Sequence, residues 1–271
     1  MINAKTKLCC IIGNPVEHSK SPLMHNAGYK ALGLNFAFLA FQVTDVQRAL
    51  QGLKSIGAQG IAVTIPHKQE VMKYIDEIDK TAKQIGAVNT IVNENGRLKG
   101  TNSDWIGAMR ALKEKTEIKG KTVSILGAGG AARAIIYGLK QEKAEKILIF
   151  NRTVENAQKL AKEFRIDDAF PIISENIISN CDIIINTTSV GMEPNSDSSP
   201  IADNVFNKNH VVFDIVYTPR ETKFLQMAKK KGATIVYGDK MVLYGALTQF
   251  ELFTGHKAPV EVMEETLRER V

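Results

Sequence analysis

Short apolar runs alternate with amphipathic segments along almost the whole chain. The apolar runs are rich in β-branched and aliphatic residues and have the length of buried strands, whereas the segments between them carry apolar residues at helical spacing. This alternation predicts an α/β fold with mainly parallel strand pairing. The expected strands are residues 8–12, 36–42, 60–65, 87–93, 123–126, 146–150, 183–187, 211–215 and 234–237.

A glycine-rich turn, GAGGAARA, follows one of these strands and leads into a helical pattern. Glycines permit a tight turn and a close approach of backbone N–H groups to a pyrophosphate, and the helix N-terminus adds a favourable partial charge. The motif therefore predicts a dinucleotide site, although an ordinary βα turn has the same pattern. The turn residues expected to contact the cofactor are Gly127, Ala128, Gly129, Gly130 and Ala131.

The end of the next strand indicates which dinucleotide binds. Asn151, Arg152 and Thr153 stand there, about twenty residues after the glycine turn, where an acidic residue reads the ribose of NAD. No carboxylate is present, and Arg152 and Thr153 are donors suited to a 2′-phosphate. We therefore predict NADP rather than NAD. The alternative interpretation is a solvated arginine that begins a helix.

The chain has 271 residues, enough for two domains with separate cores. We expect a Rossmann-like NADP-binding domain over residues 105–237. Residues 1–104 are then expected to form an α/β substrate-binding domain, which helices in residues 238–271 complete. The substrate is expected between the two domains.

Composition narrows the possible partners. With 44% hydrophobic and 24% charged residues, the chain is typical of a soluble globular protein. The net charge of +6 is spread along amphipathic segments that also carry acids, which favours a solvated face and small anionic ligands over nucleic acid. No apolar run has transmembrane length and no signal-peptide pattern is visible, so we predict a cytoplasmic protein without membrane contact.

The cysteine and histidine residues do not indicate a metal site. Cys9, Cys10 and Cys181 lack the spacing of zinc ligands, and we expect three reduced, mostly buried thiols. The histidines, such as His25 and His67, form no cluster with carboxylates and are expected to be structural or solvent-facing. We predict no metal.

Two polar motifs stand in the first hundred residues. In GIAVTIPHK, Pro66 ends a strand and delivers Lys68 to a loop, where a lone lysine is usually solvated. In SKSP, Ser21 is expected to cap a helix with Pro22 at its first position. Ser19 and Ser21 together offer hydroxyl donors to a carboxylate beside that helix N-terminus.

Together these motifs resemble those of shikimate dehydrogenases, in the same order and over nearly the whole chain. The matching stretches are GNPVEHSKSPLMHN, VTIPHK, GAVNT, GTNSDWIG, GAGGAARA, NRT, NTTSVGM and DIVYTPRETKFL. The resemblance implies reversible NADPH-dependent reduction of 3-dehydroshikimate to shikimate, a step of chorismate and aromatic amino-acid biosynthesis. It also implies a monomer or a homodimer.

The resemblance assigns roles to individual residues. Lys68 and Asp104 match the catalytic pair of the family. The residues that match substrate contacts are Ser19, Ser21, Thr64, Asn89, Asp104 and Tyr217. Gln249 lies on the same helical face as Gly245, four residues further along the chain, and is expected to reach the substrate from there. Besides the glycine turn and NRT, the residues that match cofactor contacts are Thr188, Ser189, Met192, Ile215, Gly238 and Met241. Both methionines are also compatible with core packing.

The sequence departs from the family pattern at three positions, of which the first two leave the substrate open and the third leaves the 2′-phosphate mainly to Arg152. Ala62 replaces the asparagine that usually precedes Val-Thr, Gly245 replaces a glutamine that contacts the substrate, and Asn156 replaces a second basic residue after NRT. One alternative is a paralogue acting on quinate, an aminoshikimate or another cyclic hydroxy acid. Another is a non-catalytic NADP-binding regulatory protein, which the retention of Lys68 and Asp104 disfavours.

Overall fold

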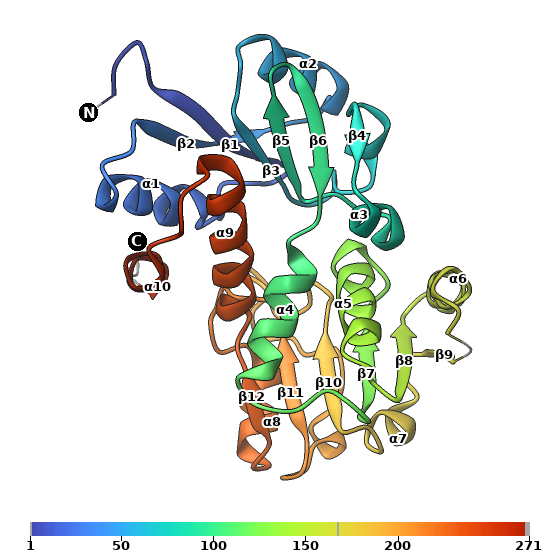
Figure 1. Cartoon of the computed structure of the whole chain (residues 1–271). Helices are drawn as coiled ribbons and strands as arrows, with labels where there is room; N and C mark the ends of the chain where they lie inside the picture. The colour runs from blue at the N-terminus through green and yellow to red at the C-terminus, as the bar shows by residue number, and fades with distance from the viewer. Residues whose placement is uncertain (1, 167, 269–271) are drawn as a thin grey trace. The chain divides into compact units, whose positions relative to one another are not determined.

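The computed structural model describes residues 2–166 and 168–268 and divides into two compact units (Figure 1). Unit 1 consists of Met1–Ser103 and Gly245–Val271, and unit 2 is Asp104–Tyr244. Helix α9 (Gly238–Thr254) therefore contributes its first half to unit 2 and its second half to unit 1. None of the described helices combines the length and apolar character needed to cross a bilayer.

Unit 1 contains a six-stranded mixed sheet of order β2-β1-β3-β5-β6-β4. Strand β1 pairs in parallel with β2 and β3, whereas β5 is antiparallel to both β3 and β6. The strands are β1 (Lys7–Gly13), β2 (Phe36–Gln42), β3 (Gly60–Val63), β4 (Glu77–Ile78), β5 (Thr90–Glu94) and β6 (Arg97–Thr101). The helices are α1 (Ser21–Ala31), α2 (Val46–Ser55), η1 (Glu70–Lys73), α3 (Lys80–Ile85) and α10 (Val260–Arg268).

The C-terminal helices are part of the core of unit 1. A Cβ atom on Gly60 in β3 would collide with the ring of Phe253 in α9, so the helix packs directly on the sheet.

His25 of α1 is fully buried and stacks on Phe38 with ring centroids 4.2 Å apart. Burial lowers the pKa of His25 to about 3, so this histidine is a neutral packing residue, as the sequence suggested.

Unit 2 contains a fully parallel six-stranded sheet of order β12-β11-β10-β7-β8-β9. The strands are β7 (Thr122–Leu126), β8 (Lys146–Asn151), β9 (Ala169–Pro171), β10 (Ile183–Asn186), β11 (Val211–Asp214) and β12 (Thr234–Val236). The helices are α4 (Asp104–Lys113), α5 (Gly130–Gln141), α6 (Val154–Phe164), α7 (Glu175–Ile178), η2 (Asp203–Val205) and α8 (Lys223–Lys230).

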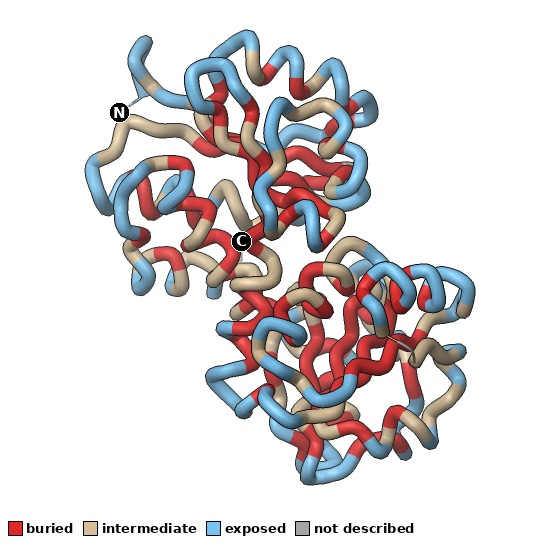
Figure 2. Tube along the Cα trace, turned by 45° about the vertical axis from the view of Figure 1, so that its right-hand side comes forward, coloured by how far each residue is buried: buried red, intermediate tan, exposed pale blue. Residues whose placement is uncertain are grey.

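Helices α4 and α5 lie together on one face of the unit 2 sheet (Figure 1). Gly138 lets them approach closely, because a Cβ atom there would lie 2.7 Å from Met109. Ile125 and Ile183 of the strands are completely buried beneath these helices. Figure 2 shows in each unit that buried positions gather toward the middle, with exposed positions around them.

The predicted α/β fold is confirmed, with corrections in both units. The pattern missed β4, β6 and β9, and it did not anticipate that β5 and β6 form an antiparallel hairpin. Asn95 and Gly96 join these strands with φ angles of 53° and 83°, the geometry that an Asn-Gly turn favours. The predicted cap at Ser21 is also wrong, since Lys20 is the N-cap and Ser21 is the first helical residue.

Candidate active site

The glycine turn after β7 depends on the absence of a side chain at Gly127. This residue has a φ of +114°, and a Cβ atom would lie 2.6 Å from the Thr187 hydroxyl oxygen. Its N–H donates to the Phe150 carbonyl at 2.7 Å, which ties the turn to the end of β8. Gly129 then precedes α5 without a capping side chain, so the first turn of the helix presents N–H groups as phosphate sites do.

Gly127→Ala is expected to lower the free energy of unfolding by about 2 kcal/mol or more, because it combines a strained φ with a collision. Gly129→Ala is the matched control. Gly129 has an extended backbone with a φ of −91°, and no atom lies within 4 Å of its Cβ position. This second variant should keep its stability and weaken NADP binding only. Urea unfolding and calorimetry measure the two effects, and equal stability losses would contradict the interpretation.

Arg152 stands at the same edge of the sheet as the glycine turn. It follows β8, where the Asn151 side-chain nitrogen donates to the Thr153 carbonyl at 2.8 Å and shapes the start of α6. Arg152 and Thr153 are exposed, and Thr153 is the N-cap of that helix without a side-chain cap bond. A guanidinium and a hydroxyl beside a helix N-terminus fit a phosphate group, so these residues fit NADP.

A buried network that the sequence reasoning missed holds the ends of β10 and β11. Asp214 accepts hydrogen bonds from the Asn186 side chain at 3.0 Å, the Val216 N–H at 3.0 Å and the Thr222 hydroxyl at 2.6 Å. Asn186 in turn accepts from the Thr188 N–H at 3.0 Å and the Thr188 hydroxyl at 2.7 Å. The network therefore fixes the loop that carries two of the predicted cofactor residues. The motifs NTTS and DIVYTP contain both groups and were the available signal.

The Asp214 carboxyl should make stability depend on pH. Burial raises its pKa from the ordinary 3.8 to about 6, so between these values the folded chain binds a proton that the unfolded chain has released. The free energy of unfolding should consequently fall by about 3 kcal/mol as the pH rises through this interval. Asp214→Asn keeps the shape and removes this dependence. Urea unfolding of both proteins from pH 4 to pH 8 checks this prediction. A free energy of unfolding that rises with pH in the wild type relative to Asp214→Asn would contradict it.

The other predicted cofactor residues lie near the ends of β10, β11 and β12. Gly238 begins α9, and a Cβ atom there would lie 2.6 Å from the carbonyl oxygens of Ile215 and Val216. Met241 is 8% exposed and packs in the core of unit 2, as the packing interpretation expects. Tyr217 as a residue is partly exposed, but its hydroxyl group is buried. This burial raises the pKa of the hydroxyl to about 12. The half-buried Met192 donates its N–H to the carbonyl of Ser189.

In unit 1, the loop that carries Lys68 is anchored by its backbone. The Thr64 N–H donates to the Ile12 carbonyl at 2.9 Å, and the Lys68 carbonyl accepts from the Val88 N–H at 2.7 Å. The ring of His67 is buried, with Nε2 2.8 Å from the Val43 carbonyl oxygen. These contacts hold the loop backbone in place, with Thr64 and Lys68 half-buried on it, and they give His67 a structural role.

Ser19 and Ser21 lie together at the start of α1. The Ser19 hydroxyl oxygen accepts from the Ser21 N–H at 3.3 Å, so Ser19 rather than Ser21 contacts the backbone of the helix N-terminus. Both residues are partly exposed. Asp104 begins α4 in unit 2, where a carboxylate is favoured by the helix dipole.

Asn89 belongs to a buried polar cluster in unit 1. It is 4% exposed, and its side-chain oxygen accepts from the Ser103 N–H at 2.7 Å and the Thr90 hydroxyl at 2.7 Å. Gln249 of α9 joins this cluster through its side-chain nitrogen. A Cβ atom at Gly245 would make only ordinary contacts with Ser103, at 3.8 and 3.9 Å, so this position has space for a side chain.

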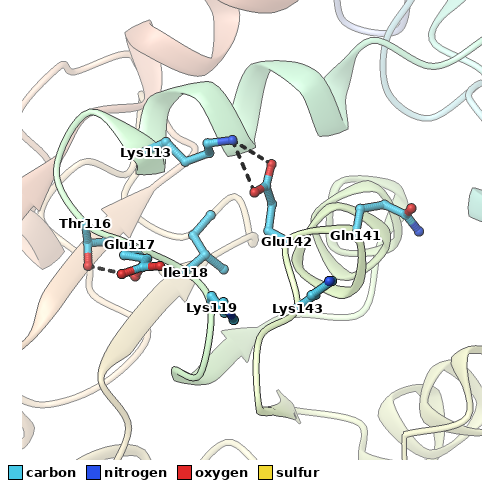
Figure 3. A pocket seen from close by; sticks show the side chains of 8 residues that line it. All are labelled: Lys113, Thr116, Glu117, Ile118, Lys119, Gln141, Glu142 and Lys143. Atoms are coloured by element: carbon cyan, nitrogen blue, oxygen red, sulfur yellow. Dashed lines mark hydrogen bonds and ion pairs between the residues drawn. The ribbon is translucent and has the colours of Figure 1, made fainter.

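A hollow of about 490 Å³ in unit 2 lies away from these residues (Figure 3). It is formed by the C-terminal ends of α4 and α5 and by the segment that precedes β7, at the opposite strand end from the glycine turn. Lys113 forms an ion pair with Glu142 across it, at 3.0 Å. None of the residues predicted to bind substrate or cofactor lines it. Its lining residues are Lys113, Thr116, Glu117, Ile118, Lys119, Gln141, Glu142 and Lys143.

The parallel sheet with its glycine turn, the basic residue after the next strand and the anchored lysine define a dinucleotide-dependent α/β dehydrogenase. Three family models match the chain: the shikimate dehydrogenase substrate binding domain over residues 11–91, shikimate/quinate 5-dehydrogenase over residues 109–231, and the shikimate 5′-dehydrogenase C-terminal domain over residues 246–268. The chain belongs to the shikimate dehydrogenase family, which confirms the resemblance seen in its motifs.

Relatives extend this similarity over the full length. The shikimate dehydrogenase (NADP⁺) of Methanobrevibacter smithii is 46% identical and aligns with 99% of this chain and 98% of its own. A crystal structure of a shikimate dehydrogenase in complex with NADP⁺ has 44% identity and a TM-score of 0.92, covering 98% of this chain and 96% of its own. The enzyme from Thermus thermophilus, in complex with NADP(H) and shikimate, has 33% identity and a TM-score of 0.90, covering 97% of this chain and 99% of its own.

Proposed function

We propose that this chain is an NADP-dependent shikimate dehydrogenase, which interconverts shikimate and 3-dehydroshikimate in the biosynthesis of chorismate and aromatic amino acids. The observation that carries the proposal is 46% identity with an NADP⁺-dependent shikimate dehydrogenase over 99% of the chain. The glycine turn after β7 and the exposed Arg152 after β8 support the same cofactor. As a biosynthetic enzyme of this family, the protein is expected in the cytoplasm as a monomer or homodimer.

In this proposal unit 1 carries most of the substrate-binding residues, while Asp104 and Tyr217 belong to unit 2. Unit 2 also binds NADP, whose nicotinamide accepts the hydride when the cofactor is bound. Ser19 and Ser21 hold the substrate carboxylate, and the ring hydroxyls contact Thr64, Asn89 and Asp104. Tyr217 also contacts the substrate. These roles agree with the half-buried hydroxyls at the start of α1 and after β3, and with the buried carboxamide that precedes β5.

Lys68 and Asp104 are proposed to manage the proton. When hydride leaves the alcohol carbon, the hydroxyl proton must leave the oxygen, and in the reverse direction the developing alkoxide needs a cation and a proton. Lys68 supplies that positive charge and a proton-transfer group from its anchored loop, while Asp104 orients the hydroxyl and the lysine. Both groups are therefore needed in either direction of the reaction.

A second candidate substrate is quinate or a related cyclic hydroxy acid. Two observations favour it. Gly245 leaves space for a side chain beside Ser103, and the buried Ala62 in β3 has only a methyl side chain. Steady-state kinetics with shikimate, quinate and an aminoshikimate separate the candidates. The proposal expects the highest kcat/KM with shikimate, and an equal or higher value with quinate would assign the chain to the paralogue.

A further inference from the structure

A series of hydrogen bonds connects Gln249 of α9 to Asn89, although the sequence separates the two residues by 160 positions. The Gln249 side-chain nitrogen donates to the Thr90 hydroxyl oxygen at 3.0 Å and to the Asn89 backbone carbonyl at 3.2 Å. All three residues are buried, with 7%, 0% and 4% of their surfaces exposed. Both hydrogens of this nitrogen are therefore directed at Thr90, the first residue of β5, and at Asn89, which precedes it.

The donors in this series of hydrogen bonds have a fixed direction. The Ser103 backbone N–H can only donate, so the Asn89 atom that it contacts at 2.7 Å must be the amide oxygen. Thr90 has a single hydroxyl hydrogen, which it donates to the same oxygen at 2.7 Å. The Thr90 oxygen must then act as acceptor toward Gln249, whose N–H orients the hydroxyl toward Asn89. The Asn89 side-chain nitrogen completes the arrangement by donating to the Ser103 hydroxyl at 3.0 Å.

We propose that Gln249 is a positioning residue for substrate binding, acting on the Asn89 carboxamide through the Thr90 hydroxyl and the Asn89 backbone. This rests on the proposed role of Asn89 in binding a ring hydroxyl. In this role both donor hydrogens of the Gln249 side chain are used inside the protein. Removing Gln249 releases the Thr90 hydroxyl and loosens the plane of the carboxamide that meets the substrate.

Gln249→Met tests the proposal, since methionine has a similar volume and no donor. We expect the KM for shikimate to rise about five- to tenfold, with kcat within about threefold of wild type and the KM for NADP⁺ unchanged. Thr90→Val removes the intermediate link and should raise the same KM. The double variant should then resemble Thr90→Val alone, because both changes break one chain of hydrogen bonds.

Asn26→Leu is the matched control. Asn26 also uses a carboxamide to hold a strand of unit 1, donating to the Phe38 carbonyl at 2.8 Å and accepting from its N–H at 2.9 Å, but on β2. It should lower the unfolding temperature without changing the KM for shikimate. An equal rise of this KM in the control, additive effects of the two cluster variants, or an unchanged KM in Gln249→Met would overturn the positioning role. Failure of the wild-type protein to turn over shikimate would overturn the proposed function as well.

Discussion

Lys68→Ala is expected to lower kcat for shikimate oxidation by about a hundredfold or more, with a smaller change in KM. The substitution removes the cation and proton-transfer group that act mainly in the transition state. It should leave the loop in place, because the anchors of this loop are backbone hydrogen bonds from Thr64 to Ile12 and from Val88 to Lys68. Steady-state kinetics in both directions, with the unfolding temperature as a check on folding, measure the effect.

Lys73→Ala is the control for a general loss of positive charge, since Lys73 is an exposed lysine of η1 in the same unit. It should leave kcat within about twofold of wild type. Lys68→Arg separates the positive charge of the lysine from its proton-transfer role, because arginine keeps the charge but does not release a proton at neutral pH. An unchanged kcat in Lys68→Ala would remove this lysine from the catalytic machinery.

Arg152→Ala is expected to raise the KM for NADP⁺ about thirtyfold or more and to leave the KM for NAD⁺ nearly unchanged. The exposed guanidinium follows β8 at the edge of the sheet where the glycine turn lies, and NAD⁺ lacks the 2′-phosphate that it is proposed to bind. Because Asn156 stands where a second basic residue is usual in the family, a single arginine should carry most of this preference. Kinetics with each cofactor at saturating shikimate provide the measurement.

Lys162→Ala serves as the control for Arg152→Ala. Lys162 is exposed on α6, the helix that follows the NRT motif, but stands in its last turn. Its removal should change neither cofactor KM by more than about twofold. Equal losses with NADP⁺ and NAD⁺ in Arg152→Ala would show that the arginine supports the fold of this edge rather than reading the 2′-phosphate.

The sequence predicted the fold best where hydrophobic runs are long and uniform. The parallel strands of unit 2 are nearly continuous apolar runs, so their positions followed from pattern alone. The missed strands are different: β4 has two residues, β9 has three, and β6 reads RLKGT, with little apolar character. The Asn95-Gly96 turn was the local signal that could have revealed the β5–β6 hairpin.

The candidate site depended more on resemblance than on pattern. Motif order indicated Lys68 as a functional residue, because it stands in a short stretch typical of the family, whereas Arg152 was indicated by its place after the strand that follows the glycine turn. The Asp214 network and the contact of Gln249 with Thr90 could not be predicted in this way. Each joins groups that come together only when strands or helices distant in sequence pack against one another.

The most direct test of the proposed function is the absorbance of reduced nicotinamide in mixtures of the purified protein with shikimate or quinate and NADP⁺ or NAD⁺. We expect rapid turnover with shikimate and NADP⁺, much slower reaction in the other three mixtures, and 3-dehydroshikimate as the product. A preference for quinate would contradict the assigned substrate. A protein that binds NADP⁺ but oxidises neither acid would contradict the catalytic assignment and support a regulatory NADP-binding protein.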